Sequence, residues 1–137
     1  MTDAMRERLA SARVARLATV RPDGSPHLVP VVFALSGETA LMPVDHKPKR
    51  TTDLQRLRNI AAEPRAALLV DAYDDDWTAL WWVRLDGRAS LVEPDSAGYD
   101  DAVAVLAVKY EQYRQNPITG RIVALAIERW TDWAYSG

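Results

Sequence analysis

The residues best suited to chemistry lie in a short basic turn, His46 to Thr52. Lys47, Lys49 and Arg50 place three positive charges within it, although the formal net charge of the chain is only −2. An apolar strand pattern precedes this basic turn, and a helical pattern follows it. The first turn of a helix carries unpaired N–H groups and a partial positive charge. Basic residues beside such a helix start favour phosphate or carboxylate, so the turn predicts a small anionic ligand.

The alternative interpretation of the basic turn is a solvated run of charges, because helix ends attract charged residues in general. His46, within the turn, is a candidate proton donor. The other histidine is His27, and two histidines without cysteine or spaced carboxylates favour structural or surface roles over a metal site. The acidic group from Asp71 to Asp76 lacks the glycine and distal glutamate of a calcium loop. We therefore predict no metal.

The composition is that of an ordinary globular protein. The 137 residues are 48% hydrophobic and 26% charged, which predicts one domain over residues 1–137. An isoelectric point near 5.7 disfavours a nucleic-acid partner. The absence of cysteine excludes disulfides and thiolate chemistry. No apolar run approaches the roughly 20 residues of a membrane span, and the charged N-terminus lacks a signal region, so we expect a cytoplasmic protein without a membrane partner.

Hydrophobic periodicity and turn residues divide the chain into strands and helices. The pattern predicts strands over 14–20, 27–35, 39–44, 66–72, 78–92 and 122–134, and helices over about 2–12, 52–62 and 95–114. Pro30 falls inside the second strand and favours an edge position or a bulge. The sequence of Arg21 to Ser25 is typical of a hairpin turn, because proline fixes φ and glycine accepts a positive φ.

The helix over 52–62 has a predicted apolar face and a predicted solvent face. Leu54, Leu57 and Ala61 follow helical spacing and form the apolar face. Arg56 and Arg58 fall off that face, so we expect them to point to water or to carboxylates. The long helix that follows residue 95 has Asp95 or Ser96 as its expected N-cap.

Three strands carry specific burial predictions. The strand over 66–72 is apolar enough to be buried on both faces. The strand over 78–92 alternates, which indicates one buried face, and Gly87 marks a candidate bulge in it. The last strand places Trp133 on the same face as Val123 and Leu125. Core packing is the expected role of Trp81, Trp82, Trp130 and Trp133, with a partner or ligand contact as the alternative.

Six antiparallel strands with inserted helices predict a barrel or sheet with flanking helices. Rossmann-type dinucleotide binding is excluded, because the chain has neither the βαβ rhythm nor a G-x-G-x-x-G motif. Hydrolase chemistry has no support, since no serine lies in a G-x-S-x-G elbow.

Four segments in this order resemble the pyridoxamine-phosphate-oxidase-like split β-barrel family, and within it the branch that binds the deazaflavin coenzyme F420. They are residues 17–31, the basic turn over 47–52, residues 59–71, and the segment from Asp76-Trp77 to Gly87. The resemblance implies an all-β fold with flanking helices, a Greek-key-like antiparallel split barrel of about six strands of the FMN-binding type. It also implies a homodimer with two cofactor sites at its interface.

The resemblance also implies roles for individual residues. Lys47 and Lys49 match basic ligands of the cofactor phosphate, and Trp77 matches a position near the cofactor. The second strand would offer mainly backbone contacts to the cofactor ring. The complete set of implied cofactor-binding residues is Lys47, Lys49, Arg50, Thr51, Thr52, Trp77, Pro30 and Val31.

The expected function is an F420-dependent oxidoreductase that transfers a hydride between the cofactor and a small unsaturated substrate. The cofactor carries that chemistry, which accounts for the lack of a compact acid–base group in the sequence. An FMN-dependent oxidase or reductase on the same scaffold is the first alternative. A non-catalytic module that binds a cofactor or haem is the second.

Overall fold

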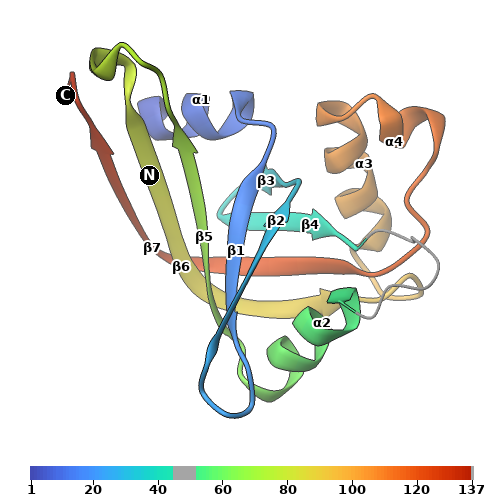
Figure 1. The fold of residues 1–137 in the computed structure, drawn as a ribbon. Coiled ribbons are helices and arrows are strands. Elements are labelled where there is room, and N and C mark those ends of the chain that lie inside the picture. Colours follow the sequence, from blue (N-terminus) through green and yellow to red (C-terminus); the bar gives the residue numbers. More distant parts are fainter. Residues whose placement is uncertain (45–51, 137) are drawn as a thin grey trace.

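Seven strands form one antiparallel sheet in the order β2-β1-β5-β6-β7-β4-β3 (Figure 1). The computed structural model describes residues 1–44 and 52–136, with side chains throughout except at 52–54. The elements are α1 (Asp3–Ser11), β1 (Ala15–Val20), β2 (Pro26–Val31), β3 (Ala34–Ser36), β4 (Thr39–Pro43), α2 (Thr52–Ala62), β5 (Arg65–Ala72), η1 (Trp77–Ala79), β6 (Trp81–Val92), α3 (Tyr99–Lys109), α4 (Gln112–Gln115) and β7 (Ile122–Ala134). The predicted fold class is confirmed, with seven strands where about six were expected.

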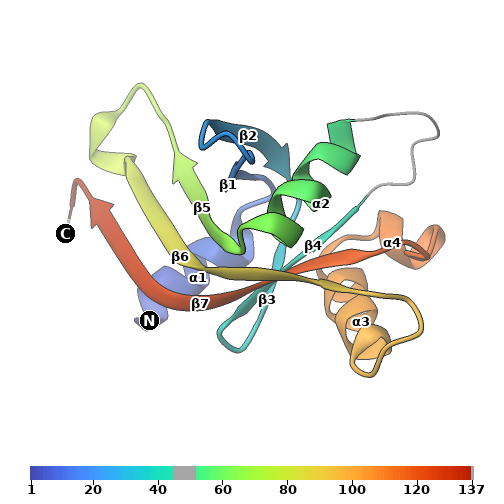
Figure 2. The same ribbon diagram turned by 90° about the horizontal axis from the view of Figure 1, so that it is seen from below.

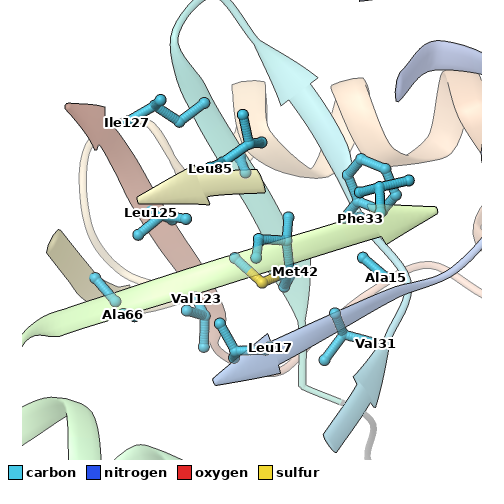
Figure 3. Close-up of a cluster of buried hydrophobic side chains, with 14 of the residues drawn as sticks. Ala15, Leu17, Val31, Phe33, Met42, Ala66, Leu85, Val123, Leu125 and Ile127 are labelled. Atoms are coloured by element: carbon cyan, nitrogen blue, oxygen red, sulfur yellow. The ribbon is translucent and has the colours of Figure 1, made fainter. Parts of the chain in front are cut away.

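The two longest strands, β6 and β7, curve together through the molecule (Figures 1 and 2). β5 pairs with β6 from Trp81 to Arg88, whereas β4 pairs with β7 from Ile122 to Ala126. The sheet therefore has two halves. Strands β2, β1 and β5 lie along one arm of this curve, and β4 and β3 lie along the other. Side chains from both halves meet in one core (Figure 3), which includes Leu17, Phe33, Met42, Leu85 and Leu125.

The bulge predicted at Gly87 is confirmed, and it lies between the two arms. The register of β6 against β7 shifts between Asp86 and Gly87. A Cβ atom at Gly87 would collide with the backbone carbonyl of Ala126, so no other residue type fits there without movement of the strands. The extra residue at a bulge also changes which face the following side chains occupy. That change explains why Trp133 is 43% exposed rather than buried with Val123.

The single strand predicted over 27–35 is wrong, because the chain leaves the sheet at Val32 and Phe33. The backbone of Phe33 bonds to a side chain instead of a strand. Its N–H donates to Tyr110 Oη at 3.1 Å, and its carbonyl oxygen lies 2.9 Å from the same hydroxyl. The division into β2 and β3 adds the seventh strand. β2 ends the sheet, which confirms the edge position expected from Pro30.

The predicted helix over 95–114 is also divided, into α3 and α4. Gly98, with φ at +89°, is the N-cap of α3, rather than Asp95 or Ser96. Tyr110 ends α3 in an extended conformation with φ −118° and ψ 115°. That conformation lets its hydroxyl reach Phe33, so one tyrosine explains both the end of α3 and the interruption of the sheet.

The buried faces of α2 and β5 differ from the predictions. Ala61 is exposed, and α2 buries Leu57 and Ile60 together with Arg56 and Asn59. In β5 burial alternates and Leu69 is exposed, so only one face of that strand is in the core. The strand expected to begin at Thr78 begins at Trp81, after η1. In the part of the chain that the structure describes, no helix has the length and apolar character needed to span a membrane.

Candidate cofactor site

Most of the basic turn lies outside the described residues. This applies to His46, Lys47, Lys49, Arg50 and Thr51, whose proposed roles stay predictions. Thr52 is the first residue of α2, and its side chain is not described. The basic turn joins β4 to α2 in the sequence, so the site is built here from the described side chains of α2 and the strands beneath it.

A group of buried polar side chains lies between α2 and the first hairpin. We call it the α2 polar cluster; its members are Thr19, His27, Arg56 and Asn59. Apart from tyrosines, these are the polar or charged side chains that are buried within residues 1–44 and 55–136. The burial of Arg56, which is only 7% exposed, contradicts the prediction that it points to solvent. Arg58 is exposed, as expected.

Hydrogen bonds fix α2 against β1 in this cluster. Asn59 Nδ2 donates to Thr19 Oγ1 at 3.0 Å, and Gln55 Nε2 donates to Asn59 Oδ1 at 2.6 Å. Arg58 Nη2 donates in turn to Gln55 Oε1 at 2.7 Å. Arg56 lies three positions before Asn59 and therefore on the same side of the helix. The chain of bonds thus holds Arg56 over the hairpin.

His27 completes the cluster from β2, where it pairs with Thr19 across the hairpin. Its Nδ1 atom is buried and has no hydrogen-bond partner. Burial is the main cause that lowers the pKa of His27, and the positive charges of Arg21 and Arg56 lower it further. The imidazole is therefore neutral at physiological pH, next to two guanidinium groups. A buried polar atom without a partner and nearby positive charge fit an anionic group.

The turn after β1 has the geometry that its residues predict. Gly24 has φ at +88°, and its N–H donates to the Arg21 carbonyl at 2.8 Å. Asp23 Oδ1 accepts from both the backbone N–H and the hydroxyl of Ser25. These bonds lower the pKa of Asp23. The turn thus keeps Arg21 beside the end of β2, where its charge acts on His27.

The other predicted cofactor residues lie on β2 and η1. Pro30 is exposed, whereas the side chain of Val31 is buried in the core, so only the backbone of Val31 is available to a ligand. Trp77 is 62% exposed at the start of η1. The segment that contains η1 follows β5 and lies at the end of β5 that is farther from α2 (Figures 1 and 2). An eight-residue strand spans roughly 23 Å, so a single chain does not bring Trp77 to the α2 polar cluster.

The sequence contains a signal for this cluster that the prediction of the apolar helix face did not use. Arg56 and Asn59 share the three-residue spacing of Leu57 and Ile60, which places the four on adjoining rows of the helix. The contact with Thr19, forty positions earlier, depends on the fold. Among residues 1–44 and 52–136, no group of three or more histidine, aspartate or glutamate side chains is arranged to hold a metal ion.

The chain was compared with protein families and solved structures. The family model described as pyridoxamine 5'-phosphate oxidase matches residues 1–134. Among solved structures, a conserved hypothetical protein of Mycobacterium tuberculosis is similar, with 22% identity and a TM-score of 0.74, over 98% of this chain and 86% of that one. The heme storage protein HutZ of Vibrio cholerae is 18% identical, with a TM-score of 0.73, over 96% of this chain and 92% of that one.

A FAD-binding protein of Mesorhizobium loti is also similar, with 22% identity and a TM-score of 0.71, over 94% of this chain and 89% of that one. At these identities the solved structures establish the fold alone. The family match covers nearly the whole chain and agrees with that fold. The chain therefore belongs to the pyridoxamine 5'-phosphate oxidase family of split β-barrels.

Proposed function

We propose that this protein is an F420-dependent oxidoreductase that acts on a small unsaturated substrate. The observation that carries the proposal is the α2 polar cluster, in which Arg56, buried on the helix that follows the basic turn, lies near His27, buried on β2. When bound, the deazaflavin ring supplies hydride transfer. The residues of this chain bind the cofactor, orient it and exclude water.

The proposed ligand of the cluster is the anionic tail of the cofactor. A guanidinium group binds phosphate or carboxylate through two parallel hydrogen bonds. Burial strengthens that attraction, because the effective dielectric constant is lower than in water. His27 Nδ1 lies in the same cluster and lacks a partner, so it offers a further polar contact to a bound anion. Lys47 and Lys49 in the basic turn would bind the phosphate.

The number of cations favours the longer F420 tail over FMN. FMN ends in one phosphate, whereas the F420 tail carries a phosphate and additional carboxylates. The basic turn contributes Lys47, Lys49 and Arg50, with Thr51 and Thr52 as neutral neighbours, and Arg56 follows on α2. A single phosphate does not need four cations. Pro30 and Val31 would border the ring through the β2 backbone, and His46 is the candidate proton donor.

The proposed functional unit is a homodimer. The face of the sheet opposite the core carries exposed Leu28 and Leu69, with Pro30 beside them. Leu28 and Leu69 lie on either side of β1. Leu28 pairs with Ala18, and Leu69 pairs with Arg16, two residues away along the same strand. We call this surface the outer face. A dimer across the outer face would bring the partner's Trp77 toward the site, which one chain cannot do.

A haem-binding module is the second candidate, favoured by the similarity to the heme storage protein HutZ. Arg21 and Arg56 suit haem propionates as well as a phosphate. FMN or FAD binding is the third, given the similar FAD-binding protein of Mesorhizobium loti. These candidates differ in the chemistry of the group that they bind, so binding experiments separate them.

The test is titration of the purified protein with F420, FMN and haem, followed by tryptophan fluorescence and by absorption. We expect saturable binding of F420 in the micromolar range or tighter, with FMN and haem at least about ten-fold weaker. Lys49→Ala should weaken F420 binding by about ten-fold, which is about 1.4 kcal/mol, with an unchanged unfolding temperature. Tight binding of haem or FMN but not F420 would replace the proposal with the corresponding alternative. An unchanged F420 affinity in Lys49→Ala would remove Lys49 from the site.

A further inference from the structure

The imidazole of His27 is a buried side chain whose hydrogen bonds are incomplete. His27 is 9% exposed, and within residues 1–44 and 55–136 no group forms a hydrogen bond with its Nδ1 atom. Its side chain projects from β2 on the same face as Val31, which is in the core. A buried polar atom without a partner costs free energy. A ligand that bonds to Nδ1 would recover that cost.

The strand register places His27 next to the buried side of α2. His27 pairs with Thr19, so their Cβ atoms are about 5 Å apart on one face of the hairpin. Thr19 Oγ1 accepts the hydrogen bond from Asn59 Nδ2 at 3.0 Å. Arg56 precedes Asn59 by three positions on α2, so their Cβ atoms are about 5–6 Å apart on one side of the helix. His27 and Arg56 therefore meet across a fixed set of contacts.

A second cation approaches His27 from the turn after β1. Arg21 Nη1 donates to the carbonyl of Pro26 at 2.6 Å, and that carbonyl belongs to the peptide group that precedes His27. Among the described residues, Arg21 and Arg56 are the charged groups that act on His27. The other members of the α2 polar cluster are neutral. In this form of the protein, burial first and then the two cations lower the pKa of His27.

A bound anion reverses this electrostatic balance. Its negative charge offsets the two guanidinium groups, so a positive charge on the imidazole is no longer opposed. Sulfate, phosphodiesters and carboxylates also accept hydrogen bonds and donate none. A bare Nδ1 atom presents a lone pair to such a ligand, whereas a protonated Nδ1 atom donates a charge-assisted hydrogen bond to it. An anion and a proton at this site therefore each favour the binding of the other.

We propose that the α2 polar cluster binds its anion together with a proton, which His27 takes up from solvent on its imidazole ring. The inference rests on the proposed function only in that an anion binds to this cluster. No covalent bond forms, and at most one proton enters with each anion. The anion binds more tightly as the pH falls from 8 to 6, and it is released more readily as the pH rises. His27 thus acts as a ligand whose charge depends on occupancy of the site.

Sulfate is a suitable probe, because it is a dianion that carries no titratable proton near neutral pH. The imidazole signals of the two histidines, His27 and His46, are followed by NMR spectroscopy from pH 5 to 8.5, and the spectrum of His27→Gln assigns them. We expect sulfate to raise the pKa of His27, which makes its protonation about ten-fold more favourable. Sodium chloride at equal ionic strength controls for screening of the two arginines and should have a smaller effect.

Two variants on α2 separate this coupling from a general effect of salt. Arg56→Gln removes one cation from the cluster, so the pKa of His27 should rise without any anion, and the further rise with sulfate should be lost. Arg58 is exposed on the same helix, and Arg58→Gln should leave both values unchanged. Backbone amide signals of α2 report whether sulfate is bound and whether each variant is folded.

The same NMR titration with F420 distinguishes failure of this inference from failure of the proposed function. If the pKa of His27 rises with sulfate in a protein that does not bind F420, the coupling stands and the proposed function is rejected. If F420 binds tightly and the pKa of His27 stays unchanged, the coupling is overturned, because His27 then donates as a neutral tautomer. Failure of both sulfate and F420 to raise the pKa of His27 also overturns it.

Discussion

At the scale of single residues, Arg56 is the most informative side chain. A buried guanidinium loses its hydration, and folding tolerates that cost only where other groups compensate it. The hydrogen bond from Asn59 to Thr19 holds the same helix face against β1, and Gln55 supports Asn59 from within the helix, so the position of Arg56 is fixed before any ligand arrives. A preorganised cation of this kind is better suited to anion binding than a mobile surface arginine.

Arg56 and Arg58 form a matched pair for testing that role. Both lie on α2, and they differ in burial. We expect Arg56→Gln to weaken F420 binding by about ten-fold or more, and Arg58→Gln to change it by less than about two-fold. Isothermal titration calorimetry measures both affinities, and thermal unfolding reports whether each variant is folded. Equal effects of the two substitutions would show that burial of Arg56 is irrelevant to binding.

The lowered pKa of His27 predicts how the stability of the protein depends on pH. Its pKa is lowered in the folded protein, first by burial and then by Arg21 and Arg56. When the pH falls below 6.5, the ordinary pKa of histidine, His27 is protonated more readily in the unfolded chain than in the folded one. The free energy of unfolding therefore falls as the pH falls through this range. Carboxyl groups with lowered pKa, such as Glu63, lose their contribution only below about 4.5.

His27→Gln should therefore flatten the dependence of stability on pH between 7 and 5. Urea denaturation at several pH values measures the free energy of unfolding for both proteins. Wild type should lose stability steadily over this window, and the variant should not. Parallel curves for the two proteins would mean that another group causes the loss.

At the scale of elements, regular patterns were predictable and long-range exceptions were not. The last strand, Ile122–Ala134, and helix α2, Thr52–Ala62, have the predicted boundaries, because local periodicity determines them. The interruption at Phe33 depends on Tyr110, which is 77 positions away. No local pattern reveals such a contact. The same limit applies to Asn59 and Thr19, so the α2 polar cluster was not predicted from the sequence.

The bulge at Gly87 makes the element-scale prediction. Gly87→Ala places a methyl group against the carbonyl of Ala126, and both atoms belong to paired strands that cannot move independently. We expect a loss of about 3 kcal/mol in the free energy of unfolding. Gly24→Ala is the control, because Gly24 has positive φ but open space around its Cα, and it should cost about 1 kcal/mol. Chemical denaturation compares them. A smaller loss for Gly87→Ala than for Gly24→Ala would contradict the close approach.

At the scale of the whole molecule, the sheet has one face in the core and one face that is only partly covered. Leu28 is 67% exposed at the edge of the sheet, and Leu69 is exposed nearby. The same face continues to Trp82 and Trp133, which pair across β6 and β7. Exposed or partly exposed apolar residues on four of the five neighbouring strands from β2 to β7 are typical of a surface that meets another protein. Charged residues on this face, such as Arg16 and Asp71, pair with each other, which lowers the cost of covering them.

The proposed homodimer can be tested by placing a charge on the outer face. Leu28→Glu introduces a carboxylate within the proposed interface, where burial without a partner is costly. Wild type should have a mass near twice the 15.3 kDa of one chain, and Leu28→Glu should be largely monomeric by light scattering. Because the partner's Trp77 is proposed to border the site, F420 binding should weaken in parallel.

Val108→Glu is the matched control, because Val108 is 80% exposed on α3, away from the outer face. It adds the same charge to an exposed apolar position, and it should leave both the mass and F420 affinity unchanged. A monomeric wild-type protein that binds F420 tightly would contradict the dimer while leaving the α2 polar cluster in place. A dimeric Leu28→Glu variant with weakened binding would instead place Leu28 in the cofactor site, because the substitution would then act on the ligand and not on the partner.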